Sequence, residues 1–393
     1  MWTRRTPWVA LLAGVTLALP AVAFAAGPPV VSAHRALGIS RLAENSLAAF
    51  TAAARAGETD IEGDARAIKD GTFVMSHDAT LRAPRCTGPY LGLSLRTLTA
   101  AQVTKIRCSG EPVARLVDVI AAVRPYPAAT LRVEVKHYGP DTSSVRSADA
   151  VRLATTLGRA GMTARSVLQD FDWATTTKAI HAAVPTQRVS ALTSTISVAK
   201  VASARSLGAA DFSYAHALST GFWNQLVSAQ GLTSTVWAVD EPLRARVLRA
   251  EGVGTLISNV PETLRATLDA PGSQCTLSRW SSSSETSRGG DLAAGASTYR
   301  YVAALSPDGR TVETVLLRVR ATTTSGTASL RVSPKGTAAG SRWEQSVVVG
   351  PSGVAVTLEV PGGDAGAVQV RNASSQVVHV SVGSAGGTAW NCP

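Results

Sequence analysis

Histidine, carboxylate and cationic side chains cluster at four places between residues 34 and 136. These places are His34-Arg35, Glu62-Gly63-Asp64, His77-Asp78 and Glu134-Val135-Lys136. Alternate residues of a strand point to the same side, so Glu62 and Asp64 lie on one side of their strand, and Glu134 and Lys136 lie on one side of theirs. Three carboxylates without a thiol suit a hard cation, Ca²⁺ or Mg²⁺. An arginine and a lysine suit a phosphate group, and two histidines suit general acid and base catalysis near neutral pH.

Each of these groups also has a plain structural explanation. A solvated strand face would account for Glu62 and Asp64, a buried core histidine for His34, and a simple ion pair for Glu134 with Lys136. However, side chains inside a barrel need partners, because burying an unpaired charge is costly. The chain has only six histidines, and two of them fall in this set. Their occurrence at successive strand ends therefore favours one functional site.

Short β-branched runs alternate with helical stretches from residue 27 to residue 270. Eight runs are expected to be strands: 30–33, 60–62, 131–135, 166–169, 188–191, 211–214, 234–237 and 255–258. Stretches with helical spacing include 46–56, 148–160, 173–184, 220–230 and 243–250. Eight strand–helix units predict an α/β fold, a (β/α)8 TIM barrel, whose catalytic side chains lie at the C-terminal ends of the strands. A doubly wound sheet is the alternative, but no glycine-rich loop follows the first strand.

An additional hairpin interrupts the barrel pattern. Lys69-Asp70-Gly71 is a turn signal, and residues 72–78 are expected to return as a strand that ends at His77 and Asp78. The following stretch, residues 80–110, is rich in loop-forming residues and contains two cysteines. A disulfide there would hold a loop beside the catalytic ends of the strands.

Residues 271–393 have a different pattern and predict a small all-β sandwich. Short strands are expected at 311–319, 328–332, 346–349, 354–358, 367–370 and 377–380, without any helix. Ser281 to Ser284 and Gly289-Gly290 indicate a linker or loop. Acidic and histidine side chains are sparse in this part, so the chemistry is expected in the barrel.

Residues 1–26 have the pattern of a secretory signal peptide. Arg4 and Arg5 precede an apolar run from Trp8 to Leu19, and small residues lead to a cleavage site near Ala25-Ala26. The run is shorter than the roughly 20 residues that span a bilayer. We expect a secreted protein without a transmembrane segment; ordinary secretion and twin-arginine export both remain open.

The cysteines agree with export. The four are Cys86, Cys108, Cys275 and Cys392, which allow three pairings. The spacing favours Cys86–Cys108 as a local pair and Cys275–Cys392 as a pair that brackets the last segment. Disulfides are expected rather than metal binding, because no CxxC motif occurs and cysteines of secreted proteins form disulfides in an oxidising environment.

The positive charge is spread along the chain. Lys and Arg number 38 against 27 Asp and Glu, a net charge of +11, without a block of like charges. This distribution excludes a dedicated nucleic-acid-binding arm. Peripheral contact with anionic surfaces or cell wall stays open.

An ordered set of motifs between residues 30 and 268 resembles the glycerophosphodiester phosphodiesterase family. The motifs are His34-Arg35, residues 44–50 (ENSLAAF), 60–64 (DIEGD), 69–71 (KDG), 76–78 (SHD), 134–136 (EVK), 236–240 (VWAVD) and 255–261 (TLISNVP). The resemblance implies a (β/α)8 barrel that hydrolyses glycerophosphodiesters to sn-glycerol 3-phosphate and an alcohol, with a divalent cation. The implied partner is a small glycerophosphodiester or a phospholipid headgroup.

The resemblance also assigns roles residue by residue. It makes His34 and His77 the general acid and base, in an order that stays open. The implied metal ligands are Glu62, Asp64 and Glu134. The implied phosphate and substrate contacts are Arg35, Lys136, Glu44, Asn45 and Trp237, the tryptophan as an apolar wall.

Four positions depart from the family pattern, and two other functions compete. Ala36, Ala43, Asp240 and Asn259 stand where Gly, Pro, Asn and Asp are usual. None removes a catalytic group, but they leave the preferred headgroup open. A sphingomyelinase D-like phospholipase D acting on intact lipids is one alternative. A non-catalytic barrel that binds cell wall or glycan is the other.

Overall fold

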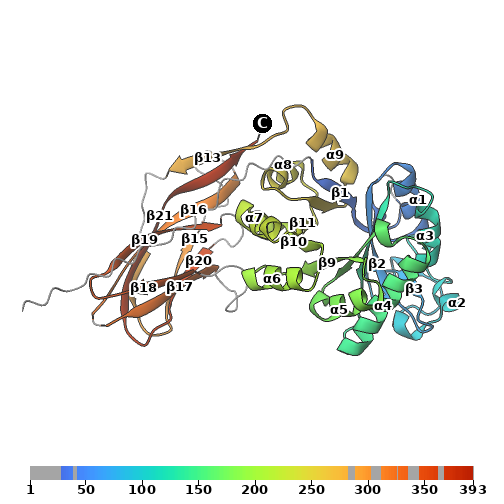
Figure 1. Cartoon of the computed structure of the whole chain (residues 1–393), viewed down its shortest axis with the longest axis horizontal. Helices are drawn as coiled ribbons and strands as arrows, with labels where there is room; N and C mark the ends of the chain where they lie inside the picture. Colours follow the sequence, from blue (N-terminus) through green and yellow to red (C-terminus); the bar gives the residue numbers. More distant parts are fainter. Residues whose placement is uncertain are drawn as a thin grey trace, which may run out of the picture.

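The computed structural model describes residues 28–38, 42–281, 288–301, 311–324, 326–334, 345–361 and 367–392. Figure 1 shows an α/β barrel and a group of antiparallel sheets side by side. The expected signal peptide, residues 1–26, lies outside the described residues. Within the described ranges, no helix is both long enough and apolar enough to cross a membrane.

Eight parallel strands form the barrel. They pair in the order β1-β12-β11-β10-β9-β8-β7-β2, and β1 pairs with β2 to close the circle. Closure confirms the (β/α)8 prediction and excludes the open doubly wound sheet. The strands are β1 (Val30–Ala33), β2 (Asp60–Ala67), β7 (Thr130–Val135), β8 (Ser166–Asp170), β9 (Arg188–Thr193), β10 (Asp211–Ala215), β11 (Thr233–Trp237) and β12 (Thr255–Ser258).

Helices on the outside of the barrel bury their apolar faces against the strands. They are α1 (Leu47–Arg55), α3 (Leu116–Val123), α4 (Ser143–Arg159), α5 (Trp173–Ala183), α6 (Val198–Ser206), α7 (Gly221–Ala229), α8 (Pro242–Ala250) and α9 (Pro261–Asp269). Local signals start several of them. The Ser46 hydroxyl accepts from the Ala49 amide at the start of α1, and prolines open α8 and α9.

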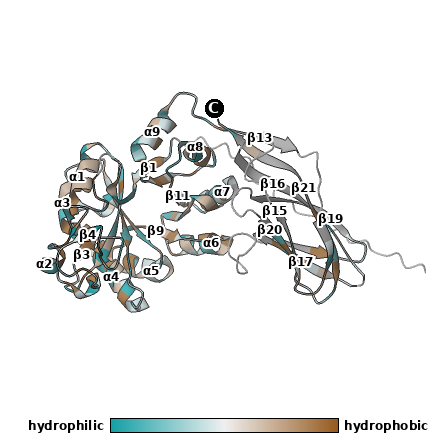
Figure 2. Ribbon diagram, turned by 180° about the vertical axis from the view of Figure 1, so that it is seen from behind, coloured by the Kyte–Doolittle hydropathy of each residue, from teal (hydrophilic) through white to brown (hydrophobic). Residues whose placement is uncertain are grey.

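The interior of the barrel is polar. Figure 2 shows hydrophilic as well as hydrophobic colour along its strands. Arg132 on β7 is buried and donates to Asp60 on β2 at 3.0 and 3.1 Å and to Asp211 on β10 at 2.9 Å. The next residue on the same face of β7 is Glu134, so this buried ion network lies directly beneath the candidate site.

The hairpin after β2 is present as predicted, but its returning strand is shorter than the expected 72–78 and ends before His77. The segment after it is more ordered than expected. Strand β3 (Phe73–Met75) runs antiparallel to β2. Residues 80–112 contain β4 (Cys86–Thr87), the 3-10 helix η2 (Leu95–Thr97), α2 (Ala100–Val103), β5 (Arg107–Cys108) and β6 (Glu111–Pro112), with β4, β5 and β6 in one sheet. A separate apolar cluster that includes Val74, Leu95 and Ile106 holds this unit against the hairpin. Strands of two residues are too short to produce a periodic sequence pattern.

Two antiparallel sheets follow α9. The strands are β13 (Thr276–Ser281), β14 (Arg288–Leu292), β15 (Ser297–Tyr301), β16 (Thr311–Thr323), β17 (Ala328–Pro334), β18 (Gln345–Val349), β19 (Val354–Pro361), β20 (Ala367–Asn372) and β21 (Val378–Asn391). One sheet joins β13, β14, β16, β19 and β21, and the other joins β15, β17, β18 and β20. Val319, Leu330 and Val370 share one buried cluster across the two sheets. In the described part after α9 no helix occurs, as predicted, but Gly289-Gly290 lie in β14, so the linker expectation there was wrong.

Both predicted disulfides are present. Cys86 bonds to Cys108, which lies directly opposite it in the β4–β5 pair. Cys275 bonds to Cys392, just before β13 and just after β21. Because β13 pairs along its whole length with the last part of β21, the second bond fastens both ends of the C-terminal segment at one place.

Candidate active site

Three buried carboxylates form the centre of the candidate site. Glu62 and Asp64 lie on β2 and Glu134 lies on the neighbouring β7, where Asp64 and Glu134 are paired in register. One ligand oxygen of each lies within 4.8 Å of the others. The predicted alternation along the two strands therefore brings all three to one point inside the barrel mouth.

The charges at this point are only partly compensated. Burial and the neighbouring Asp64 charge raise the pKa of Glu62 to about 8. Burial also raises the pKa of Glu134 to about 8, although Lys136 opposes the shift. Burial alone would raise the pKa of Asp64 too, but Lys136 and Arg35 bring it below its ordinary value. Buried oxygen ligands that resist ionisation without more positive charge are a good fit for a hard divalent cation.

Two cations lie beside the carboxylates. Lys136 places Nζ at 2.7 Å from Glu134 Oε1 and 3.4 Å from Asp64 Oδ1. Arg35 places Nε at 3.3 Å from Asp64 Oδ2, and its backbone N–H donates to Glu62 Oε2 at 2.8 Å. Arg35 has a φ of 53°, in the left-handed region, directly after β1.

Asn45 fixes the orientation of Asp64. Its side-chain amide donates to Asp64 Oδ2 at 2.9 Å, and its side-chain oxygen accepts from the Asp64 backbone amide at 3.0 Å. Asn45 itself adopts a φ of 59°, a conformation that asparagine tolerates better than most residues. Glu44, the residue before it, accepts from Arg35 NH1 at 2.9 Å and so stands at the edge of the site.

His34 is held in one tautomer. Its Nδ1 lies 2.7 Å from Asn259 Oδ1, and the Asn259 amide donates to Asp240 at 2.8 Å. Because the amide nitrogen faces Asp240, the oxygen of Asn259 must face the histidine, and Nδ1 carries the proton. Nε2 then faces Glu62 Oε2 at 4.0 Å. Burial is the main cause that lowers the His34 pKa, so the ring is neutral near pH 7.

His77 lies at the more open side of the site. It follows β3, and its side chain is 41% exposed. Nδ1 lies 3.0 Å from Asp78 Oδ1, and the backbone carbonyl of His77 accepts from the Arg66 guanidinium. The two histidines thus come from two strands that both pair with β2.

The structure adds two residues that the sequence pattern did not indicate. Gln169 on β8 donates to Glu62 Oε1 at 3.5 Å. Phe171, just after β8, stacks edge-on against Trp237 with ring centroids 6.0 Å apart, and it is 47% exposed. Trp237 therefore lies in the barrel mouth with a second aromatic ring beside it, at the end of a strand opposite the carboxylates in the barrel order.

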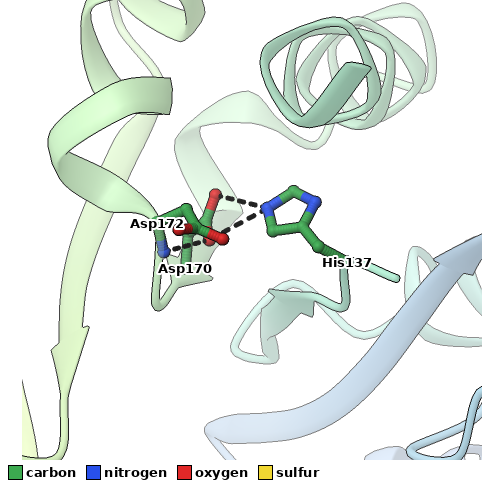
Figure 3. Close-up of side chains that lie close together, drawn as sticks. All are labelled: His137, Asp170 and Asp172. Atoms are coloured by element: carbon green, nitrogen blue, oxygen red, sulfur yellow. Dashed lines mark hydrogen bonds and ion pairs between the residues drawn. The ribbon is translucent and has the colours of Figure 1, made fainter. Parts of the chain in front are cut away.

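A second acidic group lies at the ends of β7 and β8, and its carboxylates already have donors. His137 places Nε2 at 3.1 Å from both oxygens of Asp170, with Asp172 nearby (Figure 3). Asp170 also accepts from Thr176, and Asp172 accepts from Arg146 at 2.7 Å. With these donors in place, the group joins the ends of two strands.

Known proteins resemble the part of the chain that carries these side chains. The sequence profile of the Glycerophosphoryl diester phosphodiesterase family matches residues 34–263. The chain belongs to this family. The match ends within α9, so it includes the barrel and leaves out the C-terminal sheets. Among curated protein sequences, none matches this chain.

Solved structures show the same barrel at low sequence identity. A putative glycerophosphoryl diester phosphodiesterase from Silicibacter pomeroyi is 20% identical, with a TM-score of 0.55 over 61% of this chain and 93% of that one. A glycerophosphodiester phosphodiesterase from Parabacteroides distasonis is 24% identical, with a TM-score of 0.53 over 62% and 98%. An Oleispira antarctica phosphodiesterase in complex with the product sn-glycerol-3-phosphate is 20% identical, with a TM-score of 0.54 over 62% and 98%.

Proposed function

We propose that this chain is a secreted, metal-dependent phosphodiesterase that hydrolyses glycerophosphodiesters to sn-glycerol 3-phosphate and an alcohol. The observation that carries the proposal is the buried group of Glu62, Asp64 and Glu134 with cations on both sides of Asp64. Membership of the family supports the reaction class. The product named for the Oleispira antarctica relative supports the glycerol phosphate half of the substrate.

In this proposal Glu62, Asp64 and Glu134 hold one divalent cation, Ca²⁺ or Mg²⁺. When bound, such a cation offsets the negative charge of the phosphoryl oxygens. Arg35 and Lys136 add two fixed positive charges for the remaining phosphate oxygens. Asn45 keeps Asp64 in place, and Trp237 with Phe171 forms the apolar side of the pocket.

The two histidines move the protons. His34 is neutral at pH 7, and its Nε2 lone pair is free to take a proton from the attacking water or glycerol hydroxyl, because Nδ1–H is bound to Asn259. His77 gives a proton to the oxygen of the leaving alcohol. Asp78 Oδ1, 3.0 Å from Nδ1, orients the ring for this step.

The domain organisation belongs to the same proposal. Residues 1–26 serve as the signal peptide, residues 27–270 as the catalytic barrel and residues 271–393 as an accessory sandwich. Two disulfides support an oxidising destination such as the cell exterior. The basic charge of the chain suits peripheral contact with anionic surfaces or cell wall.

A panel of substrates tests the proposal. We expect release of choline from glycerophosphocholine and much slower release from lysophosphatidylcholine or sphingomyelin. Turnover of the intact lipids alone would favour the sphingomyelinase D-like alternative. The absence of any phosphodiester turnover in the presence of Ca²⁺ or Mg²⁺ would favour a non-catalytic barrel.

A further inference from the structure

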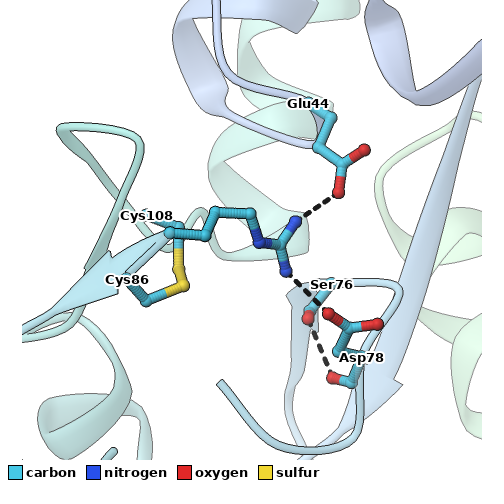
Figure 4. Close-up of a disulfide and its surroundings, with 6 residues drawn as sticks. Glu44, Ser76, Asp78, Cys86 and Cys108 are labelled. Atoms are coloured by element: carbon cyan, nitrogen blue, oxygen red, sulfur yellow. Dashed lines mark hydrogen bonds and ion pairs between the residues drawn. A yellow bond between two sulfur atoms is a disulfide. The ribbon is translucent and has the colours of Figure 1, made fainter. Parts of the chain in front are cut away.

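Arg85 bridges two carboxylates at the rim of the candidate site. Figure 4 shows the two carboxylates, Glu44 and Asp78, in the surroundings of the Cys86–Cys108 disulfide. Arg85 NH1 donates to Glu44 Oε1, and NH2 donates to Asp78 Oδ2 at 2.8 Å. The other oxygen of Asp78 faces His77 Nδ1 at 3.0 Å. The Asp78 carboxylate thus has Arg85 on one oxygen and His77 on the other.

This bridge completes a row of alternating charges around the site. Glu44 also accepts from Arg35 NH1 at 2.9 Å, so the row runs Arg35, Glu44, Arg85, Asp78 and His77. The members come from four places: the end of β1, the loop before α1, the loop before β4 and the end of β3. Arg85 is its central cation, and without it two neighbouring carboxylates would lose a shared counter-ion.

The disulfide holds the backbone of Arg85 in place. Arg85 directly precedes Cys86, whose side chain is buried and bonded to Cys108. The Arg85 carbonyl accepts from the Ser109 amide at 2.8 Å. An exposed arginine on a loose loop usually gains little from an ion pair, because ordering its long side chain costs entropy. Here the side chain is 37% exposed, but the Cys86 disulfide and the Ser109 hydrogen bond hold the backbone from which it extends.

We propose that Arg85 is a positioning residue for His77. It holds Asp78 so that the carboxylate accepts from His77 Nδ1–H, and Nε2 is left to face the substrate. A carboxylate is only an acceptor, so this contact selects the Nδ1–H tautomer of the neutral ring. The inference rests on the proposed function of His77 but concerns a residue that touches neither phosphate nor metal.

Kinetics with a matched control tests this role. Arg85→Ala is expected to lower kcat by about 10- to 100-fold, part of the contribution of a general acid, with KM changed less than about threefold. Arg85→Lys keeps the charge and should restore part of kcat. Arg82→Ala is the control, because Arg82 is exposed in the same loop and its side chain has no hydrogen bond to the described residues. Wild-type kcat in Arg85→Ala would overturn the proposal.

A double variant shows whether Arg85 acts through Asp78. Asp78→Asn with Arg85→Ala should be no slower than Asp78→Asn alone, since the arginine has then lost the group it positions. If the double variant loses kcat by the product of the two single losses, Arg85 does not act through Asp78. The comparison uses the full chain and the same glycerophosphocholine assay.

Nitrogen-15 NMR of the histidine rings gives a readout that needs no turnover. In the wild-type protein without substrate, neutral His77 should be protonated at Nδ1, and Arg85→Ala should give a mixture of tautomers. The same tautomer in both proteins would overturn the proposal. If the wild-type protein hydrolyses no glycerophosphodiester, the proposed function fails while this measurement still decides the role of Arg85.

Discussion

At the scale of single residues, the site combines two buried carboxylates with a raised pKa, a third with a lowered pKa, and two imidazoles that each face an acceptor. None of these features follows from residue types alone. Burial beside like charges raises the pKa of Glu62 and Glu134, and the Asn259 oxygen selects the tautomer of His34. Asn259 and Asp240, two of the departures from the family pattern, are hydrogen-bonded to each other. They orient a histidine together.

Removing either histidine should abolish most of the rate. We expect His34→Ala and His77→Ala each to lower kcat for glycerophosphocholine by about 10²- to 10⁴-fold, the usual contribution of a general acid or base. His379→Ala is the control, because His379 pairs with Asp291 on an exposed face of the C-terminal sheets. Full rates in the His34 or His77 variants would show that the site is elsewhere.

The stability of the metal-free protein should fall as pH rises from 5 to 8. The folded protein keeps protons on Glu62 and Glu134 up to about pH 8, whereas the unfolded chain releases them near the ordinary 4.5. The folded state therefore binds more protons in this window, and the free energy of unfolding decreases with pH. Asp64 has a lowered pKa, so its contribution to the free energy of unfolding is lost only when the pH falls below the ordinary value of 3.8.

Melting temperatures with chelator and with Ca²⁺ or Mg²⁺ check this expectation. The metal-free protein should melt on the order of 5 °C lower at pH 8 than at pH 5. The added cation should stabilise more at pH 8, where it displaces fewer protons. Glu134→Gln should reduce both the pH dependence of the melting temperature and the stabilisation by the cation. Equal stabilisation at the two pH values would contradict a site made of these carboxylates.

The sequence could predict the central residues but not their neighbours. Strand alternation and the position after each strand are local, and they were enough to bring Glu62, Asp64 and Glu134 together. Arg85 and Gln169 are distant in sequence from the site residues that they contact, and no local sequence pattern identifies them as part of the site. Their contacts depend on the closed barrel and on the disulfide loop.

At the scale of elements, two layers of charge inside the barrel keep the strands in register. Arg132 lies below Glu134 on β7 and joins β2 to β10 through Asp60 and Asp211. Removing one partner of a buried ion network is strongly destabilising, because the remaining charges stay buried without compensation. The layer therefore positions the site without contacting it.

Arg132→Met should lower the free energy of unfolding of the barrel by about 3 kcal/mol or more. At low temperature, where the Arg132→Met variant is still folded, it should keep the wild-type kcat, since Arg132 does not reach the carboxylates of the site. Arg188→Met provides the control, because Arg188 is half-exposed and only approaches Asp211 at 3.6 Å. Urea unfolding of the three proteins makes the comparison. A loss below about 1 kcal/mol for Arg132→Met would contradict a structural role for this layer.

Long periodic elements were predictable, and short or irregular ones were not. Seven of the barrel strands and helices such as α5 follow the expected ranges closely, whereas β2 runs on to Ala67, five residues beyond the expected 60–62. Strands β4, β5 and β6 have two residues each, so tertiary contacts decide them rather than pattern. In the C-terminal sheets β21 continues to Asn391 through glycine-rich sequence, because β13 and β16 pair with it on both sides.

At the scale of the whole molecule, the family match and the chemistry belong to the barrel, and the C-terminal sheets form a separate β-structured part (Figure 1). The Cys275–Cys392 bond closes a long loop of 117 residues. In the chain-entropy model, a cross-link of that length stabilises the folded state by about 4 to 5 kcal/mol. The sheets should depend on it more than the barrel does.

Cys275→Ala with Cys392→Ala should lower the melting temperature of the C-terminal sheets and leave kcat for glycerophosphocholine within about twofold of wild type. Calorimetry resolves the two transitions, and limited proteolysis locates the less stable part. A parallel loss of kcat would show that the barrel needs the sheets for its activity.

Phosphorus NMR of glycerophosphocholine incubated with the full chain tests the proposed reaction most directly. We expect the diester signal to be replaced by that of sn-glycerol 3-phosphate when Ca²⁺ or Mg²⁺ is present. Conversion should stop after chelation, return when the cation is added back, and be absent in Glu134→Gln. Conversion that is unaffected by chelator, or a diester signal that persists with either cation, would contradict a metal-dependent glycerophosphodiesterase.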